Sequence, residues 1–191
     1  MPAAQLPALD PATYLKQERK ATEKSEYLNG HVYAMAGASR EHNQLVFNLA
    51  GLLHAQLRGS PCSAFVNDMR VRSDTTESYF YPDLTVVCSD AEFEDDEMDT
   101  LLNPVLIIEV LSPSTEGYDR GAKFAHYRRI ESLHEYVLIT QDRYSIERYV
   151  RNDGGLWTLS EVSTLDAAIE LTTIGCRLQL NEVYEKVSMP L

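Results

Sequence analysis

A single glutamate, Glu109, interrupts an otherwise aliphatic run at residues 105–111. The run has the length and composition of a central strand that is buried on both faces. An ionised carboxylate in such a strand is costly unless it is paired or bound to a metal ion. We therefore expect Glu109 to have a partner, and Asp83 in the preceding predicted strand is the first candidate.

Strand alternation predicts that Asp83 and Glu109 face the same way if their strands pair, with the side chains about 5 Å apart. Two carboxylates about 4 Å apart repel by roughly 4 kcal/mol at an effective dielectric near 20. A proton or a cation would relieve that repulsion. Mg²⁺ binds one or two carboxylates, keeps several waters and leaves room for a phosphate. The pair thus predicts a Mg²⁺ site, with Mn²⁺ as the expected substitute.

Three more side chains could take part in chemistry at this site. Glu26 precedes a predicted hairpin turn, and His42 lies on the same helical side as the apolar stripe that begins at Val46. His42 should therefore point inward, toward the sheet. Lys123 falls in the predicted helix after the Glu109 strand, where it could hold a water or a phosphate oxygen near the metal.

Several short motifs together resemble the Uma-type "putative restriction endonuclease" family of the PD-(D/E)xK phosphodiesterase superfamily. They cover roughly residues 12–187, and they are Tyr81-Pro82-Asp83-Leu84, Ile108-Glu109-Val110-Leu111-Ser112-Pro113-Ser114-Thr115, Asp119-Arg120-Gly121-Ala122-Lys123 with Tyr127, and Glu135-Tyr136. Glu26 with Asn29-Gly30 resembles the family's opening glutamate and hairpin, and His42 its early histidine.

The resemblance implies a restriction-endonuclease-like α/β fold, with a mixed central sheet flanked by helices and an N-terminal β-hairpin. It implies a metal-dependent DNA endonuclease in which Asp83 and Glu109 bind the metal, and Lys123, Glu26 and His42 join them as catalytic residues. One position departs from the motif: the lysine expected two residues after Glu109 is replaced by Leu111. Lys123, from the following helix, is the matching substitute.

The elements that would position these residues alternate between helix and strand. Asp10 and Pro11 are typical of a helix start, and Asn29-Gly30 is a strong hairpin signal. The sequence predicts helices at 11–22, 39–58, 116–130 and 181–187, and strands at 26–35 (a hairpin), 62–72, 78–88, 104–111, 135–140, 144–151, 156–162 and 168–172. This order predicts a mixed α/β domain.

The length and composition are consistent with one soluble domain over residues 1–191, in which residues 1–10 form a flexible tail. No apolar stretch approaches the roughly 20 residues of a membrane span, and no secretory signal is visible. The cysteines, Cys62, Cys88 and Cys176, are odd in number and far apart. We expect buried free thiols and a reducing, cytoplasmic location.

The net charge of −12 argues against a generic nucleic-acid binder, but it is unevenly distributed. Residues 90–99 contain seven acids and no base, so the rest of the chain carries −5 (−12 + 7). This segment is expected to be a solvated loop. Basic residues cluster after the Glu109 strand and predict a local basic patch: Arg120, Lys123, Arg128 and Arg129.

Each candidate also has a purely structural interpretation. Glu109 could form an ion pair with Arg120 or Arg128, and Asp83 could cap a turn after Pro82. Lys123 stands four residues after Asp119, which is the spacing of a surface helix pair that could be removed with little effect on folding. His42 could be a half-buried histidine with satisfied hydrogen bonds, and Glu26 a solvated carboxylate at a strand edge.

The function also has an alternative of another class. The leucine at position 111 and the net charge of −12 fit a non-catalytic nuclease-fold protein that acts as an interaction or regulatory module. An endonuclease that cuts both strands would most simply be a homodimer. The aromatic run Tyr79-Phe80-Tyr81 could supply the dimer contact or stack on bases, or it could lie in the core.

Overall fold

A computed structural model describes residues 9–35 and 37–189 of the 191-residue chain. Most of the predicted tail at residues 1–10 lies outside the described residues. Within those residues, no helix has both the length and the apolar character that crossing a bilayer requires.

The helical segments, in chain order, are α1 (Pro11–Glu18), α2 (Arg40–Leu57), the 3₁₀ turn η1 (Asp74–Thr76), α3 (Glu116–Tyr118), the π-helical segment η2 (Asp119–Lys123), α4 (Phe124–Tyr127) and α5 (Leu180–Val183). The strands are β1 (Ser25–Leu28), β2 (His31–Ala34), β3 (Ser63–Val66), β4 (Arg70–Ser73), β5 (Ser78–Phe80), β6 (Leu84–Val87), β7 (Thr100–Leu101), β8 (Leu106–Leu111), β9 (Glu135–Thr140), β10 (Ile146–Arg151), β11 (Trp157–Val162), β12 (Ala168–Leu171) and β13 (Cys176–Gln179).

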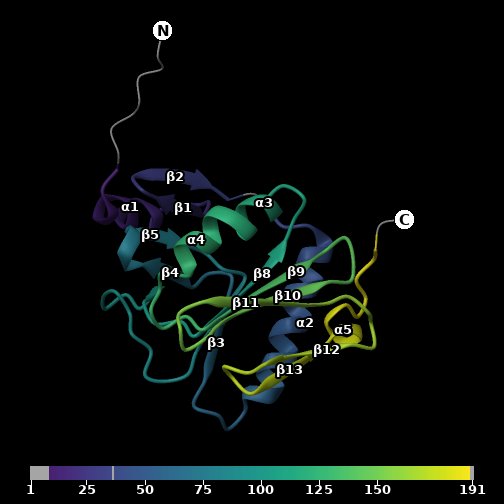
Figure 1. Cartoon of the computed structure of the whole chain (residues 1–191). Coiled ribbons are helices and arrows are strands. Elements are labelled where there is room, and N and C mark those ends of the chain that lie inside the picture. Colours follow the sequence, from purple (N-terminus) through teal and green to yellow (C-terminus); the bar gives the residue numbers. More distant parts are fainter. Residues whose placement is uncertain (1–8, 36, 190–191) are drawn as a thin grey trace.

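The strands form two large sheets and one small one, which confirms a mixed α/β fold (Figure 1). The first sheet has the order β2-β1-β5-β4-β7 and the second the order β11-β10-β9-β8-β6-β3, while β12 pairs only with β13. Both large sheets are mixed, since β4–β7 and β8–β9 are parallel and their other pairs are antiparallel. The prediction of one central sheet is thus replaced by two.

Two of the predicted strands are wrong in the same way, because each one divides and changes sheet. The strand predicted at 62–72 becomes β3 and β4, separated by a turn in which Asn67 has a φ of 53°. The strand predicted at 78–88 becomes β5 and β6, separated by residues 81–83, where Pro82 has no N–H for a ladder. Asp83 therefore lies where the chain crosses from the first sheet to the second.

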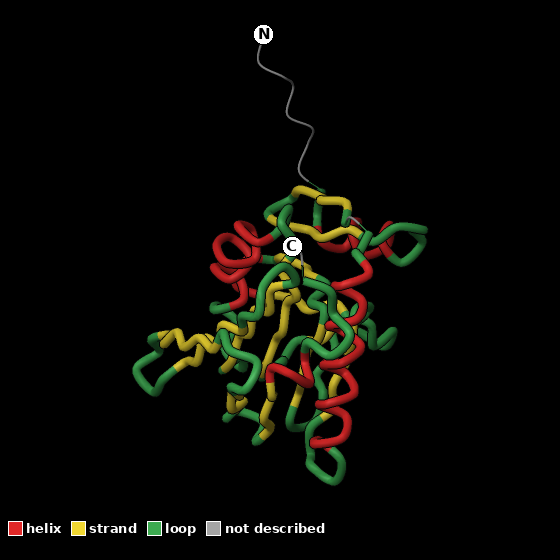
Figure 2. Tube along the Cα trace, turned by 90° about the vertical axis from the view of Figure 1, so that its right-hand side faces the viewer, coloured by secondary structure: helices red, strands yellow, loops and turns green. Residues whose placement is uncertain are grey.

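Helices cover both faces of the second sheet at β8. On one face, Leu45, Leu49 and Leu53 of α2 pack in a cluster with Leu106 and Ile108. Figure 2 shows this long helix running along one side of the strands. On the other face, aromatic side chains of α4 pack with Ile107 and Leu111. Since neighbours in a strand alternate, Glu109 belongs to the α4 side.

Local sequence signals explain the N-terminal elements. Asp10 caps α1 through the Thr13 N–H, and Ser39 caps α2 through the His42 N–H, as predicted. The predicted hairpin is confirmed as β1–β2, whose turn residues Asn29 and Gly30 have φ values of 48° and 87°. Two successive positive φ angles are what a tight hairpin turn requires.

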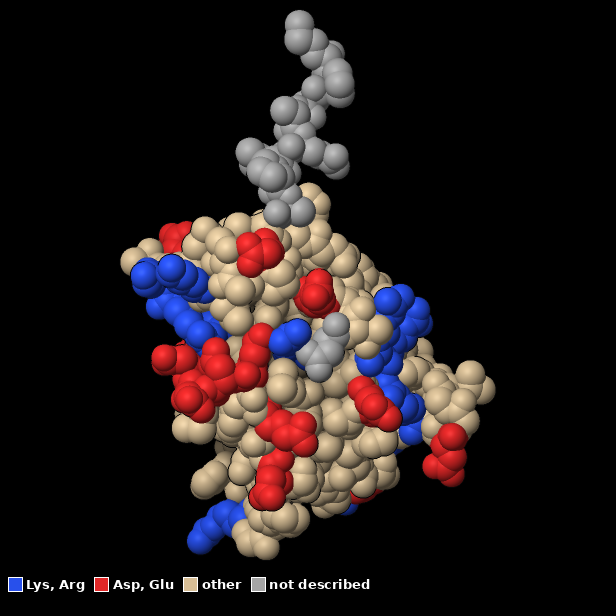
Figure 3. Space-filling model, turned by 90° about the vertical axis from the view of Figure 1, so that its left-hand side faces the viewer, with Lys and Arg blue, Asp and Glu red and all other residues tan. Residues whose placement is uncertain are grey.

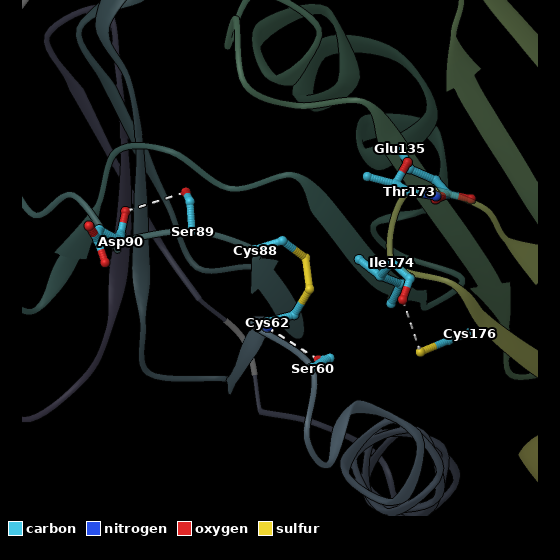
Figure 4. The surroundings of a disulfide bond; sticks show 9 residues. All are labelled: Ser60, Cys62, Cys88, Ser89, Asp90, Glu135, Thr173, Ile174 and Cys176. Atoms are coloured by element: carbon cyan, nitrogen blue, oxygen red, sulfur yellow. Dashed lines mark hydrogen bonds between the residues drawn. A yellow bond between two sulfur atoms is a disulfide. The ribbon is translucent and has the colours of Figure 1, made fainter.

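The cysteine prediction is wrong for two of the three residues. Cys62 and Cys88 form a disulfide, and Cys176 is free and buried (Figure 4). Ser63 pairs with Val87 at the end of β3–β6, so the next position outward sets the two cysteines opposite each other. Their separation of 26 residues hid a neighbour relationship that depends on strand pairing. The expectation of a reducing cytoplasm loses the free thiols on which it relied.

The acidic loop is also not simply solvated, contrary to the prediction. Asp95 and Asp99 both bind Arg19, and Asp99 also pairs with Arg70. The hydrogen bond from Arg19 is the main reason that the pKa of Asp99 is lowered, and Arg70 adds to it. Glu94 likewise pairs with Arg72. Much of the negative charge of this loop thus neutralises arginines of the same protein.

No continuous basic patch forms from the predicted cluster. Arg120 pairs with Glu116 and Glu147, and Lys123 is buried. Figure 3 shows the same trend on one face of the molecule, where basic side chains form separate groups and acidic side chains gather between them.

Candidate active site

Lys123 is the centre of a buried charge cluster between the two sheets. Its ammonium nitrogen lies 2.8 Å from Oε1 of Glu109, 3.0 Å from Oε1 of Glu26 and 3.8 Å from Oδ1 of Asp119. The residue is only 5% exposed. The interpretation of Lys123 as a surface partner of Asp119 is therefore wrong, because both side chains are buried in the site.

The π-helical segment explains how both Asp119 and Lys123 reach the interior. A π-helical turn contains an extra residue compared with an α-helical turn, and such turns are frequent at functional sites. Here the segment runs from Asp119 to Lys123 and continues directly into α4. The hydroxyl of Tyr136 on β9 donates to the Asp119 carbonyl oxygen at 3.1 Å, which ties the segment to the second sheet.

Glu109 has its expected partner, but the partner is a lysine and a tyrosine of the helix. The hydroxyl of Tyr127 donates to Oε1 of Glu109 at 2.9 Å. Burial raises the pKa of Glu109 well above its ordinary value; Lys123 opposes this rise, while Asp119 and Asp83 add to it. The alternative ion pair with Arg120 or Arg128 is wrong, since Arg120 binds other acids.

Glu26 is buried on β1, so the interpretation of a solvated edge carboxylate is wrong. Its Oε1 accepts the backbone N–H of Tyr81 at 3.2 Å as well as the lysine, and its Oε2 accepts the hydroxyl of Tyr118 at 3.3 Å. Every contact of this carboxylate therefore links the N-terminal hairpin to the segment between the sheets or to the helix of Lys123.

Asp83 and His42 form the more accessible side of the site. The Nε2 atom of His42 lies 3.1 Å from Oδ1 of Asp83, and their side chains are 15% and 17% exposed. Oδ2 of Asp83 accepts the backbone N–H of Val110 at 2.7 Å. Leu84 pairs with Ile108, so the next position outward sets Asp83 opposite Glu109. Asp83 thus binds the neighbouring strand and does not merely cap its own turn.

A second layer of residues, which the sequence analysis missed, fixes the segment between the sheets. The Tyr81 hydroxyl accepts from Arg70 at 2.9 Å and donates to Oε1 of Glu18 at 3.1 Å. Burial is the main reason that the pKa of Tyr81 rises to about 12, so its hydroxyl keeps the proton that it donates. Because Tyr79, Phe80 and Tyr81 are all buried, they cannot supply a dimer contact or an exposed stacking surface.

The donor set suits a hard divalent cation held by few protein ligands. Four carboxylates, those of Glu26, Asp83, Glu109 and Asp119, surround one lysine, so the cluster has an excess of negative charge. In the described part of the chain, no three His, Cys, Asp or Glu side chains converge as a complete set of metal ligands. This geometry fits Mg²⁺ better than Zn²⁺, because Mg²⁺ needs only one or two carboxylates and waters.

Comparison with known families places the chain. A family model named Uma2, with the description "Putative restriction endonuclease", matches residues 11–181. The chain belongs to the Uma2 family. This membership confirms the resemblance seen in the sequence motifs, and the matched range includes every residue of the site described above.

Two cyanobacterial proteins are similar over most of their lengths to this Uma2 family member. "Uncharacterized protein sll1609" of Synechocystis sp. (strain ATCC 27184 / PCC 6803 / Kazusa) is 43% identical over 86% of this chain and 93% of its own length. "Uncharacterized protein slr1290" of the same organism is 35% identical over 96% of this chain and 95% of its own length.

A solved structure shares the fold of this Uma2 family member. It is the crystal structure of a "putative nuclease belonging to DUF820" from Anabaena variabilis ATCC 29413, with a TM-score of 0.76 and 15% sequence identity. The match covers 94% of this chain and 99% of that chain. At this identity, the comparison shows a common fold.

The position that departs from the motif has a structural explanation in this Uma2 family member. Leu111 lies on the same face of β8 as Glu109, and it is buried against the aromatic side chains of α4. Lys123 approaches Glu109 from the helix instead. The lysine is therefore present in space beside the acidic residue, although it is absent from the strand.

Proposed function

We propose that this Uma2 family member is a divalent-metal-dependent phosphodiesterase that cleaves DNA as an endonuclease, with Mg²⁺ as cofactor and Mn²⁺ as a substitute. The observation that carries the proposal is the position of Lys123, whose ammonium lies 2.8 Å from Glu109 on the strand opposite Asp83. Acidic residues for a cation, with a lysine beside them, are what phosphodiester hydrolysis requires. The fold that we assign is restriction-endonuclease-like.

Each side chain has a distinct task in this proposal. Asp83 and Glu109 would hold the cation, which supplies an activated water and neutralises the negative charge of the phosphate. Lys123 would stabilise the charge that develops on the phosphate oxygens in the transition state. Glu26 holds Lys123 in place at 3.0 Å. His42 orients the Asp83 carboxylate through its contact at 3.1 Å.

Two considerations support DNA as the substrate. The description of the family names a restriction endonuclease, and the solved structure of shared fold is titled a nuclease. The net charge of −12 means that affinity for the phosphate backbone must come from the site and its cation, since no strong general attraction exists.

A non-catalytic role as an interaction module remains the second candidate, and one observation favours it. The ammonium of Lys123 is buried and already paired with Glu109 and Glu26, so the lysine has no side open to bulk solvent. Such a cluster could simply hold the two sheets together. The two candidates differ in whether a bound metal ion leads to cleavage.

A single-turnover cleavage assay on labelled duplex DNA, with Mg²⁺, Mn²⁺ or EDTA, separates the two functions. The nuclease proposal expects cleavage with either metal and none with EDTA. It also expects Asp83→Asn and Glu109→Gln to lose activity by at least about 10²-fold, the scale of one lost transition-state contact. Glu131→Gln, a matched change at an exposed carboxylate, should cleave normally. A wild-type protein that binds metal and cleaves neither DNA nor RNA would favour the module.

A further inference from the structure

Strand β2 forms an open edge of the first sheet, next to the site. It is the terminal strand in the order β2-β1-β5-β4-β7, and residues 31–35 are all exposed. Its apolar side chains are among the most exposed large ones of the described residues: Val32 is 47% exposed, Tyr33 54% and Met35 36%. The edge therefore presents both backbone hydrogen-bonding groups and apolar surface to solvent.

The sequence of this edge lacks the usual protection. Proteins discourage edge-to-edge pairing with charged side chains, proline or bulges on exposed edge strands. In a chain of net charge −12, residues 29–39 contain no Asp, Glu, Lys, Arg or Pro. The register of β2 on β1 is also regular from His31 to Ala34. An edge strand without charge or interruption is suited to pairing with another strand.

The register identifies the backbone groups that are free to pair. Met35 donates its N–H to the carbonyl of Lys24, so the alternate residues Tyr33 and His31 also bond to β1. The N–H and C=O groups of Val32 and Ala34 consequently point away from β1, toward the open edge. Two outward-facing residues on a short strand are enough for a small antiparallel ladder.

We propose that β2 pairs with β2 of a second copy of this chain, antiparallel across a two-fold axis, with Tyr33 opposite Tyr33 of the second copy. This register matches the outward groups of Val32 with those of Ala34 in both directions, and it brings two aromatic side chains together at the axis. A second copy suits the edge better than DNA does, because the strand carries no cation that could contact a phosphate. Two acidic molecules can also approach most closely where neither is charged.

The pairing would give the dimer a functional geometry, an argument that rests on the proposed nuclease function. Glu26 lies opposite Tyr33 in the hairpin, so the site is one strand away from the edge. Two copies would then place their Glu26 residues three strand spacings apart, which is about 14 Å. That separation is comparable to the width of a DNA major groove, about 12 Å. A two-fold axis normal to the shared sheet would also present the same face of both copies to one duplex.

Sedimentation velocity of the full chain in the absence of DNA and metal tests the assembly independently of activity. The proposal expects a dimer of twice the 21.6 kDa chain mass at micromolar concentration. Tyr33→Lys, which places two like charges at the axis, should shift the protein to monomer. Leu156→Lys, the same kind of change at a 69% exposed leucine in the turn between β10 and β11, should leave the dimer intact. A monomeric wild type, or a Tyr33→Lys variant that stays dimeric, would overturn the proposal.

Engineered cysteines test the register. Directly opposed residues of a non-hydrogen-bonded antiparallel pair have Cα atoms about 4.5 Å apart, within the range of a disulfide. Tyr33→Cys should therefore give a covalent dimer under mild oxidation, while Val32→Cys, whose copies are diagonal to each other, should cross-link much less. Equal cross-linking of both variants would contradict the register. If the dimer forms as expected but no nucleic acid is cleaved, the proposed function fails and the interface stands.

Discussion

Lys123 reaches Glu109 from a π-helical turn to a buried strand, and their charged atoms lie 2.8 Å apart. Neither side chain is more than 6% exposed. Each residue is therefore the main compensation for burying the other, and Glu26 and Asp119 extend the same dependence. The cluster has a structural role whether or not it also has a chemical one.

We predict that Lys123→Met strongly destabilises the protein, because it leaves Glu109 and Glu26 buried without a cation. Breaking a buried ion pair on one side typically costs about 3–5 kcal/mol. This differs from the expectation of nearly intact folding that follows from an exposed lysine. Urea unfolding should show the loss, and the double variant with Glu109→Gln should recover part of it. An unchanged midpoint in Lys123→Met would contradict the role of the pair.

We predict that Asp83 and Glu109 bind one divalent cation together. Calorimetry with Mn²⁺ should show a single site in the wild type, which Asp83→Asn and Glu109→Gln each abolish. Glu131→Gln should bind Mn²⁺ as the wild type does, because its carboxylate is exposed and remote in the fold. Unchanged binding in either site variant would exclude that carboxylate as a ligand.

Metal affinity should rise with pH. Burial raises the pKa of Glu109 well above its ordinary 4.5, so the metal-free folded protein holds this proton more tightly than the unfolded chain does. The resulting stability is complete below the ordinary value and is lost as pH rises through the raised value. Metal binding needs the ionised carboxylate and must release that proton, which increases affinity by up to about tenfold per pH unit in this window. Calorimetry in buffers of different ionisation enthalpy should detect the proton, and Glu109→Gln should release none.

Reduction of the Cys62–Cys88 disulfide should lower stability without disabling the site. A disulfide of this kind typically contributes about 2–4 kcal/mol by restricting the unfolded chain. It joins β3 to the end of β6 that lies away from Asp83. Thermal unfolding with and without reductant should show the difference, and Cys176→Ser should retain it. A large loss of Mn²⁺ binding on reduction would contradict the separation of the two regions.

Tyr81→Phe should destabilise the protein moderately and leave Mn²⁺ binding measurable. The variant removes the hydroxyl that joins Arg70 to Glu18, and an unsatisfied buried polar group costs about 1–3 kcal/mol. The backbone N–H that binds Glu26 is kept. Urea unfolding and Mn²⁺ calorimetry on the same sample measure the two effects separately. An unfolding midpoint equal to that of the wild type would show that the hydroxyl is dispensable.

Local signals in the sequence predicted most elements well. The strand at 135–140, the caps at Asp10 and Ser39 and the hairpin at Asn29-Gly30 are as predicted, because each depends on neighbouring residues alone. The isolated charge of Glu109 correctly indicated a buried partner. Inward-facing His42 was also predicted from the helical stripe, and it contacts Asp83.

The errors share a physical cause, which is that pairing between distant segments is not written in local patterns. The division of the strand at 78–88 depends on which sheet each half joins. Cys62 and Cys88 meet because of the β3–β6 register. The π-helical turn leaves the composition of the helix unchanged, so nothing in the spacing of Asp119 and Lys123 distinguished a buried pair from a surface pair. Tyr81 was recorded as an aromatic residue, and its hydroxyl and N–H contacts required the folded chain.

The π-helical segment makes the length of this helix as important as its composition. Each residue of an α-helix advances the chain by about 100° around the axis. Deleting one residue of η2, for example Gly121, whose position is open and exposed, would let the helix relax to an α-helical turn and rotate Lys123 out of line with Asp119 and its other partners. Insertions and deletions here therefore act on the site even when every charged residue is retained. In alignments of related chains, a gap between the aspartate and the lysine is consequently more informative than a substitution.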